Sequence, residues 1–373
     1  MRIAVLGTRG VPAAYGGFET RAEELSARLA ARGHDVTVYA RPAGVRTHVK
    51  EYRGVRVVLV PTVRHKYLDT VVHGFLTGLH AAAARYDAVL FCNGINALTC
   101  RLPRLLGSET RVVLNVDGLE RNRRKWNRLG RLAYAVSERL SCVLPDAVVT
   151  DARSIEAYYL GTYGTASTFI PYGSDLPWPD GHATLDRLGL EPGGYVLYVS
   201  RLEPENNADA VVRGFRNFGG GLRLALVGSA PYAGDFMGCV RREAAHDPRV
   251  LLPGALYGEE YRQLLAHAAA YVHATEVGGT HPALIEAMGF GRPLLVHDTP
   301  ENREAAADTA VYFDAHEPAT LTRALETLFA SPPERERRGR EARRRAEELY
   351  RWEAVTDAYE HVLSGDPLRS RDV

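Results

Sequence analysis

Short apolar runs alternate with longer amphipathic segments in the first half of the chain. The first run, Ile3–Leu6, is followed by a segment that places Ala22, Leu25 and Leu29 on one helical face. Further short runs follow at Val36–Tyr39, Val55–Val60, Ala88–Phe91 and Arg111–Val116. Buried parallel strands that alternate with amphipathic helices produce this pattern, so we predict a parallel sheet covered by helices on both faces.

The same alternation starts again in the second half. It begins at Tyr195–Ser200 and continues at Leu222–Val227, Val250–Leu252, Ala270–His273 and Pro293–His297. A segment rich in glycine and proline, 170–181, separates the halves and is typical of a linker. We therefore predict an α/β protein with two doubly wound, Rossmann-like domains that face a central cleft. Ligands of such folds bind outside the carboxyl ends of the strands, so we expect the site in that cleft.

Composition narrows the classes of protein that this chain can represent. It has 373 residues, of which 46% are hydrophobic and 24% charged, as in ordinary globular proteins. The 46 Lys and Arg residues nearly balance the 45 Asp and Glu residues, so no overall field recruits nucleic acid. The four cysteines form no CxxC pair or Cys/His metal spacing, and no apolar run is long enough to span a membrane. We expect a cytoplasmic protein with free thiols.

The first candidate loop, Gly7–Thr20, follows the first predicted strand. It lacks the GxGxxG spacing of nicotinamide-binding loops but is glycine-rich and opens a helix. Thr20 and Glu23 have the spacing of a capping box, and backbone amides near Gly16 and Gly17 could face an anion. A turn that needs positive φ explains the glycines equally well.

The second candidate loop joins a predicted strand to a short helix. Pro282 suits the first position of that helix and Gly291 its C-terminal cap. The double glycine Gly278-Gly279 precedes the helix, whose free N–H groups and dipole suit a diphosphate. Glu286 lies one turn into the helix, where its carboxylate could accept hydrogen bonds from two hydroxyls of a ribose. The alternative is that Glu286 is a solvated helix residue.

The third candidate loop, Ser200–Asn207, follows the first strand of the second half. Arg201 would reach the carboxyl edge of the sheet, where it could clamp phosphate oxygens as charge builds on a leaving group. The alternative is an ion pair with Glu203 or Glu205.

Together these loops resemble the family-4 glycosyltransferases, which are retaining enzymes with the two-domain GT-B fold. The resemblance is carried by Gly16–Thr20, Arg32–Val38, Tyr198–Glu205 and Glu286–Pro293. With the boundary placed in the linker, it implies an N-terminal acceptor-side domain, 1–172, and a nucleotide-sugar-binding domain, 173–352. The last segment, 353–373, is expected to be a helix that crosses back to the N-terminal domain.

More narrowly, the chain is similar to bacterial members described as rhamnosyltransferases. The similar segments are Gly7–Pro12, Tyr15–Thr20, Asn115–Glu120, Glu203–Asn207 and Val277–Pro282. This similarity implies dTDP-L-rhamnose as the donor and a cell-surface glycan, lipid-linked or not, as the acceptor. The nucleotide sugar is then the substrate, and no cofactor is expected.

The family resemblance also implies where the donor binds. Glu286 matches the ribose-binding Glu of a Glu-x7-Glu motif, but the earlier Glu falls on Gly278. Arg201 matches the diphosphate-binding Arg, while the usual Lys is replaced by Asn206. We interpret both departures as altered donor recognition, and Glu276 could supply a missing contact. The expected donor-binding residues are Gly16, Gly17, Arg201, Asn206, Tyr257, Gly278, Gly279, Thr280, His281 and Glu286, with Tyr257 stacking on the base.

Retaining members of this family are thought to react by front-side attack, in which the leaving phosphate takes the acceptor proton. The protein then supplies positioning and charge stabilisation. That chemistry needs no Asp-x-Asp metal site, and the sequence contains none, so no metal is expected. The expected catalytic residues are Asp117, Arg201 and Glu286. Asp117 would orient the acceptor hydroxyl or polarise the sugar; the alternative is a loop Asp in an Asx turn.

A basic segment, 121–131, follows Asp117. If it is helical, Arg121, Arg124, Lys125, Arg128 and Arg131 share one face, with Trp126 beside them. A basic stripe bordered by an aromatic residue suits an anionic membrane surface or a diphosphate-linked lipid acceptor. Arg124, Lys125, Trp126 and Arg128 are therefore candidates for acceptor or membrane contact at the inner face of the cytoplasmic membrane. A solvated charged face explains the stripe equally well, and no nucleic-acid-binding motif accompanies it.

Three functions remain open on the sequence. The first is rhamnosyl transfer from dTDP-rhamnose. The second is the same fold acting with a UDP- or GDP-hexose donor or on a small-molecule acceptor. The third is a non-catalytic GT-B protein that acts as a binding partner in glycan assembly, which the departures at Gly278 and Asn206 keep open.

Overall fold

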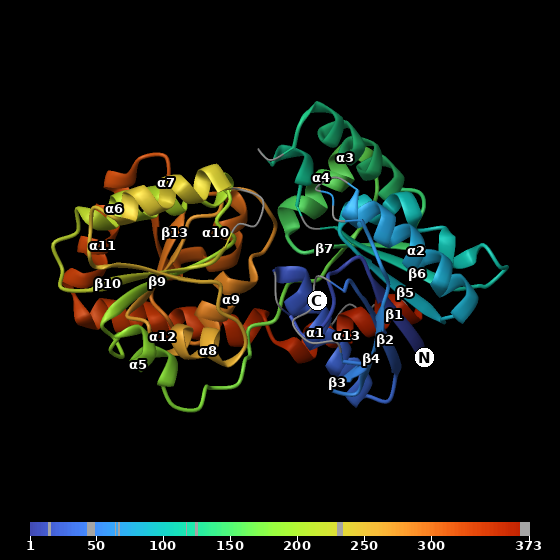
Figure 1. Cartoon of the computed structure of the whole chain (residues 1–373), viewed down its shortest axis with the longest axis horizontal. Helices are drawn as coiled ribbons and strands as arrows, with labels where there is room; N and C mark the ends of the chain where they lie inside the picture. The colour runs from blue at the N-terminus through green and yellow to red at the C-terminus, as the bar shows by residue number, and fades with distance from the viewer. Residues whose placement is uncertain are drawn as a thin grey trace. The chain divides into compact units, whose positions relative to one another are not determined.

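Two parallel sheets organise the chain, one in each of two units. The computed structural model describes residues 1–13, 16–42, 49–63, 65, 68–116, 118–123, 126–229 and 234–365. Unit 1 contains Met1–Tyr172 together with the C-terminal segment from Trp352, and unit 2 contains Gly173–Arg351 (Figure 1). The first domain is therefore assembled from both ends of the chain.

The sheet of unit 1 has the order β3-β4-β2-β1-β5-β6-β7-β8 within the described residues. Its pairs are parallel except for β3 with β4. β1 lies at the centre, where Ile3 is paired with Val36 of β2 and Ala88 of β5. Because the chain proceeds from β1 toward one edge and later returns to its other side, the order reverses between β1 and β5. The strands are β1 (Arg2–Leu6), β2 (Asp35–Ala40), β3 (Glu51–Tyr52), β4 (Val55–Leu59), β5 (Ala88–Cys92), β6 (Arg111–Val116), β7 (Ala147–Thr150) and β8 (Thr168–Phe169).

Helices cover both faces of this sheet. One core joins the sheet to the apolar faces of α1 and α13, and the other joins it to α2 and α4 (Figure 1). The predicted face of α1, with Ala22, Leu25 and Leu29, is buried in the first of these cores. The helices of the unit are α1 (Gly17–Ala31), α2 (Asp69–Ala84), α3 (Arg128–Ser141), α4 (Arg153–Tyr163) and α13 (Trp352–Ser364), with 3-10 turns η1 (Gly94–Thr99), η2 (Leu102–Arg104) and η3 (Glu120–Asn122).

The sheet of unit 2 is parallel throughout its described strands, in the order β11-β10-β9-β12-β13-β14. The order reverses between β9 and β12, because β10 and β11 lie on one side of β9 and the later strands on the other. The strands are β9 (Tyr195–Val199), β10 (Arg223–Val227), β11 (Val250–Gly254), β12 (Ala270–His273), β13 (Leu294–His297) and β14 (Ala310–Phe313).

Two apolar cores again enclose the sheet. Side chains of α5, α8, α9 and α12 build one core, and those of α6, α7 and α11 build the other (Figure 1). The helices are α5 (Ala183–Leu188), α6 (Ala208–Arg216), α7 (Gly234–Ala244), α8 (Glu259–His267), α9 (Pro282–Gly289), α10 (Pro300–Ala306), α11 (Pro318–Ala330) and α12 (Pro332–Leu349), with 3-10 turns η4 (Pro204–Asn206) and η5 (Ala307–Thr309).

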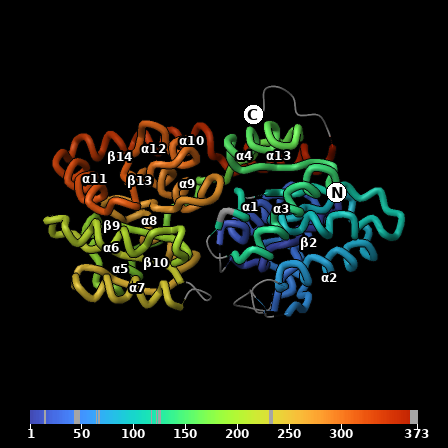
Figure 2. The backbone as a smooth tube through the Cα atoms, turned by 90° about the horizontal axis from the view of Figure 1, so that it is seen from above, coloured from blue at the N-terminus to red at the C-terminus, as the bar shows by residue number. Residues whose placement is uncertain are grey.

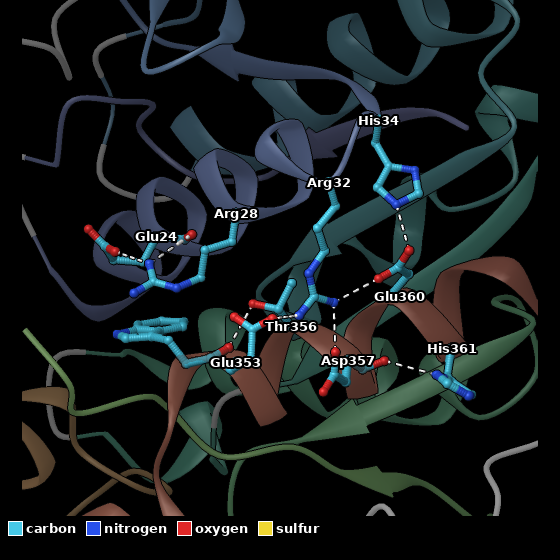
Figure 3. Close-up of polar contacts among 10 residues, drawn as sticks. Glu24, Arg28, Arg32, His34, Glu353, Thr356, Asp357, Glu360 and His361 are labelled. Atoms are coloured by element: carbon cyan, nitrogen blue, oxygen red, sulfur yellow. Dashed lines mark hydrogen bonds and ion pairs between the residues drawn. The ribbon is translucent and has the colours of Figure 1, made fainter.

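The last helix, α13, returns to unit 1 and packs on α1 (Figure 2). Trp352 is fully buried in the core below α1. Arg32, directly after α1, contacts the carboxylates of Glu353, Asp357 and Glu360, the last two at 2.7 and 2.8 Å (Figure 3).

His34 adds a contact of 2.8 Å from its Nε2 to Glu360. Burial opposes ionisation of Glu360, but hydrogen bonds from Arg32 and His34 outweigh it and lower the pKa of that carboxyl. The charged cluster therefore fastens α13 to the first domain.

Two local predictions are wrong. The basic segment 121–131 is not one helix, because η3 ends at Asn122 and α3 begins only at Arg128, where Asn127 accepts a hydrogen bond from Gly130 N at 2.9 Å. Thr20 is not an N-cap, because α1 already begins at Gly17 with Gly16 as its cap. The capping box does not form because Glu23 instead accepts a hydrogen bond from Ala13 N, at 2.6 Å, in the loop before the helix.

No helix in the described ranges has both the length and the hydropathy needed to cross a bilayer.

Candidate functional site

The reversal of strand order between β9 and β12 places two of the predicted loops next to each other. Because β9 and β12 are neighbouring parallel strands, the loop after β9, 200–207, and the loop after β12, 274–281, leave the same edge of the sheet. This is where doubly wound folds bind ligands. Backbone hydrogen bonds join the loops, since Glu276 N donates to the carbonyl oxygen of Glu205 at 3.0 Å.

Glu286 lies on α9 at this edge and is held by a tyrosine from another helix. The hydroxyl of Tyr261, on α8, donates to Glu286 Oε2 at 2.5 Å. Burial and the neighbouring carboxylate raise the pKa of the Tyr261 hydroxyl well above its usual value, so it remains a donor. Glu286 is only 3% exposed, so the interpretation of a solvated helix residue is wrong. The carboxylate is an oriented acceptor.

Arg201 takes the ion pair that the sequence left as an alternative. Its guanidinium lies 3.5 Å from Glu203 Oε1, and its side chain remains 28% exposed. The loop around it is fixed by Asn206, whose Nδ2 donates to the carbonyl oxygen of Arg201 at 2.5 Å. The hydroxyl of Tyr198 in turn donates to the carbonyl oxygen of Asn206 at 2.6 Å. Arg201 therefore projects from a rigid loop, and its diphosphate contact stays a prediction.

Asn207 connects the two loops through its side chain. It has φ +55°, a left-handed conformation that Asn tolerates better than most residues. From this position Nδ2 donates to the carbonyl oxygen of Ala274 and to Glu276 Oε1, both at 2.9 Å. Glu276 also lies 3.4 Å from Nε2 of His316. Glu276 is thus engaged by protein groups in the described structure, and its role as a sugar contact stays a prediction.

The glycine at position 278 has a local structural reason. Gly278 has φ +148°, and a Cβ there would lie 2.5 Å from Cε1 of His281. A glutamate at this position would need a different turn before α9. The departure from the family pattern is therefore built into the shape of this loop.

The start of α9 is surrounded by histidine rings. His281 is the N-cap residue, without a side-chain capping bond, and its ring lies 4.7 Å from that of His273. Burial, followed by the proximity of His281 and His297, lowers the pKa of His273 well below its usual value, so its ring is neutral at pH 7. Thr280, beside His281, and Gly279 are both buried.

Tyr257 follows β11 at the far side of β10. It is half-buried and belongs to the same edge of the sheet as the donor loops. Its stacking on a base stays a prediction.

In unit 1, the glycine-rich loop after β1 is closed by carboxylates of α1. Glu19 accepts from Arg9 N at 2.9 Å, and Glu23 accepts from Ala13 N. These two amides are therefore not offered to an anion. Gly16 caps α1 through its carbonyl oxygen, which accepts from Glu19 N and Thr20 N at 3.1 and 3.2 Å, and Gly17 is the first helical residue.

The acceptor-side residues are only partly within the described structure. Asp117, Arg124 and Lys125 lie outside the described residues. Trp126 is half-buried and donates from Nε1 to Glu120 at 3.4 Å, and its ring centroid lies 5.1 Å from that of Tyr134 with the two rings tilted by 45°. Arg128 is exposed at the start of α3.

Arg121 does not belong to an exposed stripe. Its guanidinium donates to the hydroxyl of Tyr158 at 2.6 Å and lies 3.5 Å from Glu138.

Sequence reasoning missed Tyr261 and Asn207 as site residues. Tyr261 lies 25 positions before its partner Glu286, and no local pattern connects them. For Asn207 a weak signal existed, because Asn directly before a helix often adopts a left-handed or capping conformation.

Two sequence families match the chain, and together they span most of it. Residues 16–173 match a family described as a glycosyl transferase 4-like domain. Residues 187–345 match the glycosyl transferases group 1. The search of curated proteins found no match.

Solved structures with the same fold cover both chains almost completely. Sucrose-phosphate synthase from Thermosynechococcus elongatus is 19% identical, with a TM-score of 0.81 over 98% of this chain and 100% of that one. HepE of Anabaena in complex with UDP-glucose is 16% identical, with a TM-score of 0.80 over 98% and 100%. WaaG, a glycosyltransferase involved in lipopolysaccharide biosynthesis, is 17% identical, with a TM-score of 0.73 over 97% and 100%. At these identities the likeness establishes the fold.

Proposed function

Since the chain belongs to the GT4-type glycosyltransferases of the GT-B fold, we propose that it transfers L-rhamnose from dTDP-rhamnose to a growing cell-surface glycan. The acceptor is a glycan or a lipid-linked precursor, and the anomeric configuration is retained. The donor is a substrate, and no cofactor enters the reaction.

The observation that carries the donor site is the hydrogen bond from partly buried Tyr261 to buried Glu286 at the carboxyl edge of unit 2. A carboxylate that Tyr261 holds in place can accept hydrogen bonds from ribose hydroxyls in a fixed direction. Held in place before the donor arrives, it loses little conformational entropy on binding. We place the diphosphate near Arg201 and the start of α9.

The proposed chemistry follows from these positions. When the glycosidic bond to the diphosphate breaks, negative charge grows on the leaving phosphate oxygen, and the same oxygen takes the proton of the acceptor hydroxyl. Arg201, partly exposed at the end of β9, would stabilise that charge. Asp117 would orient the acceptor hydroxyl.

The preference for rhamnose rests on the similarity of the loop sequences to those of rhamnosyltransferases. The backbone at Gly278 supports it, because this loop offers no side-chain carboxylate at the position where the family usually contacts the donor sugar. A deoxy sugar has fewer hydroxyls to recognise, which fits a site with one polar contact fewer.

A UDP-hexose donor is the second candidate. It is favoured by the structural likeness to HepE, which was solved with UDP-glucose.

Calorimetric titration with dTDP, UDP and GDP tests both candidates. We expect dTDP to bind most tightly and Glu286→Ala to weaken it by about 1.5–3 kcal/mol, because hydrogen bonds to a charged group are lost. Preference for UDP would replace the rhamnosyl proposal with the second candidate. Unchanged affinity of Glu286→Ala would remove Glu286 from the site.

Glu326→Ala is a suitable control, because Glu326 is exposed on a different helix of the same unit, α11, away from the start of that helix. This variant should bind nucleotide as the wild type does. Release of dTDP from dTDP-rhamnose in the presence of acceptor then tests turnover, and its absence with every donor would favour the non-catalytic alternative.

Helix α3 supports peripheral membrane contact on unit 1. Its exposed apolar side chains Leu129, Leu132 and Val136 are 75%, 61% and 44% exposed and lie at i, i+3 and i+7. Exposed arginines border them, namely Arg128, Arg131 and Arg139. An apolar strip flanked by cationic side chains is the pattern of helices that lie in the interface of an anionic membrane.

Vesicle sedimentation tests this contact. The wild type should sediment with vesicles rich in phosphatidylglycerol, and Leu132→Glu should release most of it by placing a charge at the apolar strip. Leu160→Glu is the matched control, because Leu160 is similarly exposed on α4 of the same unit. Equal sedimentation of both variants and the wild type would refute membrane contact through α3.

A further inference from the structure

Three side chains that are far apart in sequence converge at the carboxyl edge of unit 2. Glu276 follows β12, His297 ends β13, and His316 follows β14. Because these strands are parallel neighbours, their ends lie side by side. One potential ligand atom from each residue lies within 4.8 Å of those of the other two. Apart from that grouping, no three His, Cys, Asp or Glu side chains in the described ranges come together in this way.

We propose that Glu276, His297 and His316 form a binding site for a zinc ion beside the donor loop. Two imidazoles and one carboxylate are a ligand set that zinc accepts, with the fourth position left to solvent. Magnesium and calcium instead favour sites built from oxygen ligands. The site is separate from the proposed chemistry, which uses no metal.

The distances suit a small tetrahedral ion. Zinc bonds of about 2.0–2.2 Å place neighbouring ligand atoms about 3.3–3.6 Å apart. Glu276 Oε1 and His316 Nε2 are already 3.4 Å apart. His316 is exposed on a loop, so its ring can move to complete the set.

Hydrogen bonds hold the Glu276 carboxylate and the backbone of the loop that carries His316. Asn207 donates to Glu276 Oε1 at 2.9 Å. The backbone N of His316 donates to Asp314 Oδ1 at 2.9 Å. A partner that holds a ligating carboxylate, as Asn207 holds Glu276, raises metal affinity.

His297 can supply a ligand nitrogen without leaving its position. It is 5% exposed; its Nδ1 accepts a hydrogen bond from Ala315 N at 3.1 Å and also lies 3.3 Å from the carbonyl oxygen of Phe313. Zinc at Nε2 requires the tautomer in which Nδ1 carries the proton and donates to Phe313. That tautomer gives up the hydrogen bond from Ala315 N, so metal binding at Nε2 would exchange one backbone partner of Nδ1 for the other.

A bound ion would join three loops of the donor edge. Glu276 belongs to the loop that continues to Gly278 and α9, and through Asn207 it is connected to the loop that carries Arg201. Zinc would thus stiffen the donor loop against β13 and β14.

The test is calorimetric titration of the full chain with zinc chloride after removal of metals by a chelator. We expect one saturable site at micromolar concentrations in the wild type. His316→Ala and Glu276→Gln should each weaken binding at least tenfold. Glu276→Gln keeps an oxygen that can accept from Asn207, so the loop stays in place. His361→Ala, which removes an exposed histidine from α13, should bind zinc as the wild type does.

Thermal unfolding provides a second readout, since a ligand that binds the folded state raises its Tm. Zinc should raise the Tm of the wild type and of His361→Ala but not that of His316→Ala. The absence of a saturable site in the wild type, or equal zinc affinity in all four proteins, would overturn the proposal. Neither measurement uses a nucleotide, so their failure would leave the donor proposal untouched.

Discussion

Replacing Tyr261 by Phe tests whether the buried hydroxyl prepares Glu286 for a nucleotide. The substitution removes one oxygen and leaves the ring in place. The lost hydrogen bond is short, 2.5 Å, and runs to a carboxylate on a residue that is 3% exposed. A hydrogen bond to a charged group contributes about 1.5–3 kcal/mol, so we expect the free energy of unfolding of unit 2 to fall by about 2 kcal/mol.

The effect on binding should be smaller than the effect on stability. Without Tyr261, Glu286 can still accept hydrogen bonds from ribose, but the bound nucleotide has to orient it. We expect nucleotide affinity to fall by about three- to tenfold, where tenfold corresponds to about 1.4 kcal/mol. Calorimetry with the best-bound nucleotide measures the affinity, and urea unfolding followed by circular dichroism measures the stability.

Tyr195→Phe is the matched control. Tyr195 is fully buried, and its hydroxyl donates to the carbonyl oxygen of Leu264 at 2.5 Å, but it lies at the amino end of β9. This variant should lose stability and keep nucleotide affinity. If Tyr261→Phe binds nucleotide as tightly as the wild type while Glu286→Ala does not, Tyr261 only supports packing, and the idea that its hydroxyl prepares the carboxylate is refuted.

Three further substitutions test the scaffold. Gly228→Ala should lower the free energy of unfolding of unit 2 by about 3 kcal/mol, because Gly228 has φ +154° and a Cβ would collide with the carbonyl oxygen of Ser200. Gly219→Ala is the control, because the space around Gly219 is open, and it should change urea unfolding little. Arg21→Met should lower the free energy of unfolding by about 3–5 kcal/mol, because it removes the ion-pair partner, 3.7 Å away, of the buried Asp151 carboxylate. Adding Asp151→Asn should recover part of this stability. If nothing is recovered, the packing of Arg21 on Tyr172 contributes more than the ion pair. Glu360→Gln should lower stability by about 1 kcal/mol at pH 7, a value discounted for partial exposure. Since its folded pKa lies below its ordinary 4.5, the contribution of Glu360 is complete above that pH and disappears as the pH falls further; a difference from wild type that persists unchanged at pH 3 would contradict this.

Strand positions were predictable because hydrophobic periodicity is a local property. The runs Arg111–Val116 and Ala270–His273 coincide with β6 and β12, and the other predicted runs differ from their strands by one or two residues at an end. The glycine- and proline-rich segment likewise contains the boundary between the units at Tyr172. Each of these signals is contained in a few consecutive residues, whose burial on both faces requires continuous apolar sequence.

The two wrong local predictions have a common cause. Thr20 and Glu23 have the spacing of a capping box, yet Glu23 accepts hydrogen bonds from Ala13 N and from the hydroxyl of Tyr52. In the segment 121–131, Arg121 is drawn to Tyr158 and Glu138 of other helices. The spacing of residues along the chain predicts hydrogen bonds within one segment. These bonds do not form when the side chain makes hydrogen bonds to residues of another segment instead.

The sequence by itself thus determined two α/β units, their central strands and the loops that follow β1, β9 and β12, whereas β3, β7, β8 and β14 were not predicted. Only the tertiary structure decided which side chains meet at those ends. Glu286 is held by Tyr261 from a neighbouring helix, and Glu276 meets histidines from two other strands. The physical reason is that strand order decides which loops lie next to each other. Strand order depends on how separate helices and strands pack into one core, and it cannot be read from any short segment of the sequence.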